Sequence, residues 1–153
     1  NLNITVDDGS VSVPINNLSG EQIGLFSFRP TDVGIIERYN KIAKDFDEII
    51  APLESANISG DGTASDETSA AALEEAGKRL YEAVDFLFGG NTSEAFFGKM
   101  HPFSPVGGNF YCVNVLNAVG QFIAAQFDKE INQINGQMKK SKAVAKYTEG
   151  YET

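Results

Sequence analysis

The stretch VDFLFGGNTSEAFFGKMHPFSPVGGNFY, residues 84–111, connects two predicted helices. It carries almost no charge, so the way it packs determines how these helices meet. It holds six phenylalanines, five glycines and the single histidine of the chain. Gly89 and Gly90 are well placed to end the preceding helix, since glycine readily takes the left-handed conformation at a helix C-terminus. We therefore predict a packed elbow between helices at this point of the chain.

The elbow itself contains signals for a short helix and a turn. Thr92 or Ser93 can cap a helical piece, which Gly98 can end in turn. Two X-Pro pairs then favour an extended connection. Gly107 and Gly108 let the chain turn into the next helix.

The phenylalanines of the elbow are denser than a surface loop tolerates. We expect most of them to fill the core where the helices meet, because each aromatic ring buries a large apolar area. We expect a minority to be exposed, where they would mark a protein–protein site. The six residues are Phe86, Phe88, Phe96, Phe97, Phe103 and Phe110.

Upstream of the elbow, a regular apolar stripe predicts a helix over residues 31–53. Thr31 or Asp32 can cap its start, and Pro52 should stop or kink its end. The stripe consists of Ile35, Tyr39, Ile42, Phe46, Ile49 and Leu53, at spacings of 4, 3, 4, 3 and 4. A stripe this regular usually packs against another helix, in the same chain or in a partner.

The remaining helical part is predicted over residues 70–138. It contains a second helix over about 69–88 and a last helix from about Gly108 to Met138. Residues 54–69 are small, polar and acidic without periodicity, and we expect a mobile loop there. Residues 139–153 are expected to form a basic tail.

The N-terminal residues 1–29 are predicted to form a β segment. LNITV (2–6), VSVPI (11–15) and IGLFSF (23–28) alternate apolar and polar residues, which is typical of strands. DDGS (7–10) supplies turn residues for a hairpin between the first two strands. The predicted fold is therefore α+β and predominantly helical, with about three long helices and an N-terminal hairpin or small antiparallel sheet, in a single domain of 153 residues.

Composition restricts the possible functions. A net charge of −9 argues against nucleic acid as a partner, since phosphate binding needs clustered Lys and Arg. No apolar run approaches the roughly 20 residues that span a bilayer, so we expect no membrane partner. Cys112 is the only cysteine, which excludes an intrachain disulfide and fits a reducing, cytoplasmic compartment.

No catalytic constellation stands out in the sequence. The glycines of the elbow lack the Lys-Ser or Lys-Thr of a P-loop, and His101 is the only histidine for a zinc site or a serine hydrolase. Neighbouring acids such as Glu74 and Glu75 do not face each other on a helix. We therefore predict a protein that is not an enzyme, with no cofactor, no metal and no catalytic residue.

Three segments in order resemble a family of phage and prophage proteins from Gram-positive bacteria. They are FSFRPTDVGIIERYN, VDFLFGGNTSEAFFG and VAKYTEGYET, and they match the family's "F-x-P-x-D", "D-x-L-F-G…E-A-x-F-G" and "KY…Y" elements. The family is similar to the tail assembly chaperones encoded between the major tail protein and the tape measure protein. The resemblance covers most of the chain except residues 54–69.

The resemblance implies binding of the hydrophobic tape measure protein, contacts with other tail proteins and self-association, in the bacterial host cytoplasm. The candidate partner-binding residues are Ile35, Tyr39, Ile42, Phe46, Ile49, Phe96, Phe97 and Phe103. Two alternatives remain open. One is a structural tail component, such as a tube or connector subunit, and the other is a small binding module of unknown ligand.

Overall fold

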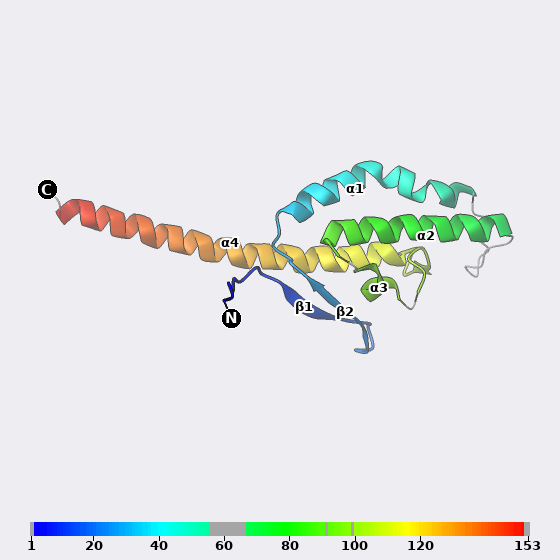
Figure 1. Ribbon diagram of the computed structural model, residues 1–153, viewed down its shortest axis with the longest axis horizontal. Helices are drawn as coiled ribbons and strands as arrows, with labels where there is room; N and C mark the ends of the chain where they lie inside the picture. Colours follow the sequence, from blue (N-terminus) through cyan, green and yellow to red (C-terminus); the bar gives the residue numbers. More distant parts are fainter. Residues whose placement is uncertain (1, 56–66, 91, 99, 152–153) are drawn as a thin grey trace.

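The computed structural model describes residues 2–55, 67–90, 92–98 and 100–151, and their side chains except those of Ser55 and 141–151. It confirms the predicted α+β fold, which consists of long helices and a small antiparallel sheet near the N-terminus (Figure 1).

The N-terminal sheet is a hairpin of β1 (Val11–Asn16) and β2 (Gln22–Phe28). The strands are antiparallel, with Val13 opposite Phe26. The turn between them is held by Asn17, whose Oδ1 accepts hydrogen bonds from two main-chain amides at 3.0 and 2.9 Å. Along β2 exposed and buried residues alternate, which turns Phe26 and Phe28 toward the helices and Leu25 toward solvent.

The prediction of a strand over residues 2–6 is wrong. Residues 2–10 form no strand, and Leu2 and Ile4 are almost completely exposed. The carboxylates of Asp7 and Asp8 instead accept hydrogen bonds from amides two residues later, which folds DDGS into local turns. Because β1 pairs with β2, residues 2–6 are not part of the sheet and their apolar side chains do not pack on either of its faces.

The predicted helix 31–53 is divided into two elements. Helix α1 spans Gly34–Ile50, and a 3-10 helix, η1, follows over Ala51–Ser55. The change occurs next to Pro52, whose missing N–H cannot continue the α-helical hydrogen bonds. Helix α2 spans Glu67–Phe88, so the predicted loop 54–69 ends earlier than expected. Residues 56–66 of this predicted loop lie outside the residues that the structure describes.

The elbow contains the short helix α3 (Ser93–Phe97) and a second, minimal hairpin. Strands β3 (Pro105–Val106) and β4 (Asn109–Phe110) are joined by Gly107 and Gly108. Both glycines have positive φ, +62° and +84°, as the central residues of a type I′ turn require. The two glycines thus close a hairpin before the last helix begins.

Helix α4 spans Tyr111–Tyr151, which is 41 residues. The prediction that this helix stops near Met138 is wrong, since the expected tail 139–153 is helical through Tyr151. Residues 139–148 include Ala and Lys, which favour helices, and no proline follows Pro105 to end it. Figure 1 shows the first part of α4 packed under α2 and the rest extending away from the body.

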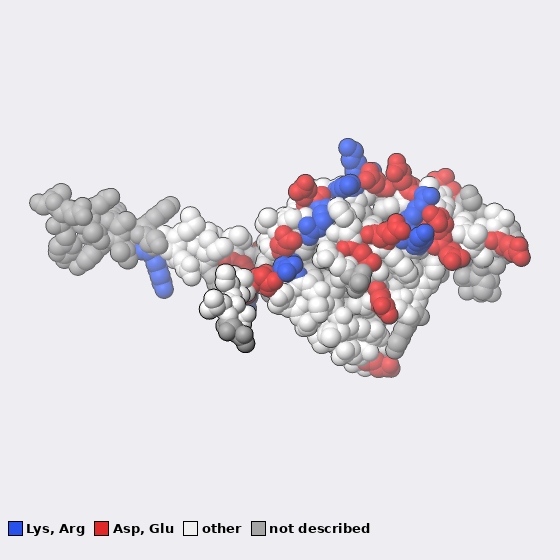
Figure 2. Space-filling view, in the orientation of Figure 1, with Lys and Arg blue, Asp and Glu red and all other residues white. Residues whose placement is uncertain are grey.

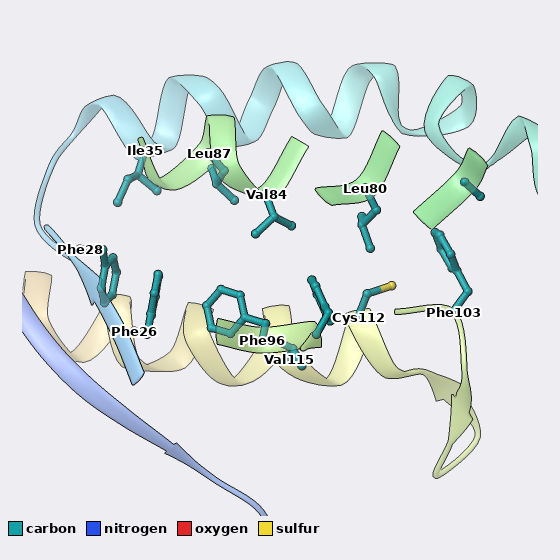
Figure 3. Packing of buried hydrophobic residues seen from close by; sticks show 12 residues of the cluster. Phe26, Phe28, Ile35, Leu80, Val84, Leu87, Phe96, Phe103, Cys112 and Val115 are labelled. Carbon is teal, nitrogen blue, oxygen red and sulfur yellow. The ribbon is translucent and has the colours of Figure 1, made fainter. Parts of the chain in front are cut away.

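The core lies between α2 on one side and β2, α3 and the start of α4 on the other (Figure 3). Phe26 stacks on Phe28 with ring centroids 3.9 Å apart, and Phe96 meets Phe26 edge to face at 4.4 Å. The buried apolar residues are Phe26, Phe28, Ile35, Ala76, Leu80, Val84, Leu87, Phe96, Phe97, Phe103, Cys112 and Val115. Of the six elbow phenylalanines, Phe96, Phe97 and Phe103 belong to this core and Phe88 packs against it, whereas Phe86 and Phe110 are 47% and 42% exposed.

Candidate functional site

The structure separates the predicted partner-binding residues into buried and accessible ones. Four are buried, with at most 7% of each exposed, and therefore do not form a surface in this fold: Ile35, Phe96, Phe97 and Phe103. Ile42 and Ile49 are partly buried against the core, and Phe46 is half-buried. Tyr39 is 56% exposed on the outer side of α1.

A groove between α1 and α2 brings together two of the predicted residues, Ile42 and Ile49, and is not lined by Tyr39 or Phe46. Its apolar floor is made by Ile42 and Ile49 from α1 and by Ala83 and Phe86 from α2. Phe86 is 47% exposed, more than the other apolar residues of this floor. The groove has a volume of about 510 Å³ and is open to solvent.

Charged side chains surround this floor. The lining includes Lys41, Asp45 and Glu48 from α1 and Arg79 and Glu82 from α2. The ammonium group of Lys41 lies 5.2 Å from the centre of the Phe86 ring, which is a cation–π distance. Figure 2 shows acidic and basic side chains alternating over this side of the body. An apolar floor with a charged rim is the arrangement that accepts the apolar face of an amphipathic helix.

Two arginines hold α1 against α2 and thereby set the width of the groove. Arg38 donates from Nε to the carbonyl oxygen of Leu87 at 2.8 Å, near the end of α2. Arg79 donates from Nη1 to the carbonyl oxygen of Glu48 at 2.7 Å, near the end of α1. Because both acceptors are main-chain oxygens near helix ends, these bonds also satisfy carbonyl groups that lack helical partners.

Asp32 orients Arg38 at the start of α1. Its carboxylate accepts the Gly34 amide at 2.9 Å and pairs with Arg38 Nη2 at 3.1 Å. The amide hydrogen bond and then the arginine lower the pKa of Asp32. The prediction that Thr31 or Asp32 caps this helix is therefore wrong in position: Val33 is the N-cap of α1 and makes no side-chain cap hydrogen bond, and Asp32 accepts the Gly34 amide from one residue earlier.

Asp85 connects the groove helix α2 to the elbow. Its Oδ1 accepts the amides of Thr92 and Ser93 at 2.8 and 2.7 Å, and its Oδ2 accepts the Ser93 hydroxyl at 3.2 Å. The start of α3 is therefore capped by a carboxylate from another helix rather than by Thr92 or Ser93 itself.

His101 lies beside a second hollow, on another face of α2. Its Nε2 donates to the carbonyl oxygen of Leu73 at 3.1 Å, and its Nδ1 accepts the Phe103 amide at 3.1 Å. Burial lowers the pKa of His101, and the hydrogen bond to Leu73 opposes this shift. Gly77 leaves room for the ring, since a Cβ there would lie 2.9 Å from Nε2. These two hydrogen bonds give the half-buried ring a structural role in the turn before Phe103.

Cys112 is 1% exposed, and burial raises the pKa of its thiol to about 11. A buried thiol with this pKa behaves as a small apolar side chain. Within the described residues, no group of three or more His, Cys, Asp or Glu side chains is placed to hold a metal ion.

Comparisons with family models, curated proteins and solved structures gave no match, so function has to be argued from the residues of this chain. In the described part of the chain, no helix combines the length and the apolar character needed to cross a membrane.

The α2 side of the groove was not predicted from the sequence. Arg79, Glu82, Ala83 and Phe86 lie at positions i, i+3, i+4 and i+7, which share one helix face. Of these four residues, only Phe86 belonged to a predicted feature, as one of the six elbow phenylalanines. A helix face with one large apolar residue among charged neighbours is hard to distinguish from an ordinary solvated face.

Proposed function

We propose that the groove between α1 and α2 binds an apolar helical segment of a partner protein and keeps it soluble. In this proposal the protein is a non-enzymatic tail assembly chaperone, and the partner is the tape measure protein of the same gene cluster. The observation that carries the proposal is the open apolar floor of Ile42, Ile49, Ala83 and Phe86 inside a charged rim. The partner implied by the family resemblance is consistent with such a floor.

The size of the groove suits one helix face. Ile42 and Ile49 are seven residues apart on α1, which is about 10 Å along a helix axis. A partner helix would place two or three apolar side chains over this length and leave its other face to solvent or to further copies of the protein. Several copies along one long apolar chain would then be needed to cover it.

Co-expression with the tape measure protein, followed by affinity pull-down, tests the proposal. Phe86→Glu places a charge on the floor at a side chain that is already half exposed, so the fold should persist. The matched control is Leu18→Glu, at a fully exposed apolar residue in the turn between β1 and β2. We expect a soluble complex with the native chain and the control, and loss of the complex with Phe86→Glu. An unchanged complex with Phe86→Glu would contradict binding in the groove.

A further inference from the structure

The second half of α4 presents apolar side chains that nothing in the described structure covers. Every residue from Asp128 to Lys140 is exposed. Within this distal segment, Ile131, Ile134 and Met138 are 49%, 48% and 52% exposed. An exposed fraction near one half is typical of a side chain that contacts only its own helix. Figure 1 shows that this part of α4 extends away from the rest of the protein.

These residues continue an apolar stripe that begins in the core. Ile123 packs against the core, and Phe127, Ile131, Ile134 and Met138 follow at spacings of 4, 4, 3 and 4. From Phe127 onward the pattern is that of the a and d positions of a coiled coil. A single solvated helix of this length is marginally stable in water, and Gly136 weakens it further because glycine is a poor helix former. A second helix on the stripe would supply the missing stability.

The distribution of charge along the chain indicates which partner helix would bind this apolar stripe. Residues 131–148 contain Lys139, Lys140, Lys142 and Lys146 and no acidic residue. The whole chain has 12 basic and 21 acidic residues, so the remainder is strongly acidic. The basic end of α4 is therefore complementary to the body of another copy of the same chain.

We propose that the distal segments of two copies pair antiparallel as a short coiled coil. Ile131 of one copy faces Ile134 of the other, and Phe127 faces Met138, which gives four apolar layers related by a twofold axis. This inference does not depend on the groove between α1 and α2.

The antiparallel direction follows from where the acidic body lies. Phe122 on α4 contacts Phe28 at the end of β2, with ring centroids 6.1 Å apart. Arg29, the next residue, pairs with Asp8 at 2.9 Å, so the acidic Asp7–Asp8 turn lies near this part of α4. In the antiparallel register, Lys139 and Lys140 of one copy lie opposite residues 126 and 125 of the other, within one helical turn of Phe122. A parallel pair would instead place the lysines of both copies side by side, which is unfavourable.

Sedimentation velocity of the full chain over about a hundredfold range of concentration tests whether the pair forms. We expect a concentration-dependent dimer that weakens as salt is added, since its charges are attractive and solvent-exposed. The double variant Ile131→Gln, Ile134→Gln should weaken the dimer by about a hundredfold or more, because four apolar side chains lose their cover. Asn132→Gln, on another face of the same turn, should leave it unchanged.

Both substituted residues lie outside the core, so the double variant should remain folded, as circular dichroism will verify. A monomer at all concentrations would overturn the proposal, and a different partner would then have to cover the stripe. A dimer that survives the double variant would also overturn it, because the contact would then lie elsewhere.

Disulfide trapping tests the direction of the pair. Protein with Phe127→Cys, mixed with protein carrying Met138→Cys, should form a cross-linked heterodimer under mild oxidation. Met138→Cys alone should not cross-link to itself, since the two positions would lie about 16 Å apart along the axis. Self-cross-linking of Met138→Cys would overturn the antiparallel arrangement. The buried Cys112 does not interfere, because it is 1% exposed.

Discussion

Arg38 donates a hydrogen bond from Nε to the carbonyl oxygen of Leu87 at 2.8 Å, across 49 residues of sequence. This contact ties the start of α1 to the end of α2, and Asp32 holds the guanidinium in place from the other side. With Arg79 at the opposite end, it fixes the two walls of the groove. The shape of the groove therefore depends on these hydrogen bonds to main-chain oxygens as well as on the apolar side chains of its floor.

Arg38→Ala should lower the free energy of unfolding by about 1–3 kcal/mol, because hydrogen bonds from charged groups contribute this much. Urea denaturation followed by circular dichroism measures the change. Arg29→Ala is the matched control. Its ion pair with Asp8 is largely exposed, and we expect a loss of at most about 1 kcal/mol. Equal losses in the two variants would show that Arg38 does not hold α1 in place.

Gly24→Ala should destabilise the protein by about 1–3 kcal/mol, as overpacking of a well-packed site does. A Cβ at this position of β2 would clash with the carbonyl oxygen of Ala95 in α3, and main-chain atoms cannot move aside as a flexible side chain can. Gly136→Ala is the control, since a Cβ there meets nothing within 4 Å and alanine favours the helix. Thermal denaturation of the two variants should therefore differ in sign. A Gly24→Ala protein as stable as the native one would mean that α3 is not seated on the sheet as described.

Asp85→Ala should cost about 0.5–2 kcal/mol, the range measured for loss of a helix cap. The substitution removes the Oδ1 acceptor that the Thr92 and Ser93 amides share, and the Thr92 amide keeps its hydrogen bond to the Gly90 carbonyl oxygen at 3.0 Å. Hydrogen exchange should therefore accelerate most at the Ser93 amide and less at the Thr92 amide. Glu94→Ala, in the exposed first turn of α3, is the comparison and should leave both amides protected. Unchanged protection in Asp85→Ala would contradict the cap.

His101 should make stability depend on pH. Its pKa is lowered in the folded chain, chiefly by burial, from an ordinary value of 6.5. The folded state therefore favours the neutral ring. Its contribution is fully present above about pH 6.5 and is lost as the pH falls through 6.5 toward the lowered pKa. Unfolding free energies measured above and below this pH should show the loss in the native chain and a smaller one in His101→Gln. The same pH dependence in both proteins would assign it to other groups.

The sequence was most informative where periodicity and turn chemistry agreed. The stripe of α1, the glycine end of α2 and the short α3 were predicted close to their observed bounds. The aromatic elbow was predicted as core because no surface loop accommodates so many phenylalanines, and Phe96, Phe97 and Phe103 are buried as that argument requires.

Other features depended on tertiary contacts that one sequence does not contain. LNITV alternates as a strand does, but β1 pairs with β2 instead. The groove depends on Arg79 and Arg38 reaching main-chain oxygens of another helix, for which neither residue carries a sequence signature. The length of α4 was underestimated because a lysine-rich end was interpreted as a tail, although lysine and alanine also favour a helix.

The most direct test of the groove is nuclear magnetic resonance of the ¹⁵N-labelled protein, titrated with a helical apolar peptide from the tape measure protein. Our account predicts that the largest chemical-shift changes fall on Lys41–Ile49 of α1 and Arg79–Phe86 of α2, and that Phe86→Glu abolishes them. Changes confined to other surfaces, or no change at saturating peptide, would contradict the central claim that the groove between α1 and α2 binds the partner.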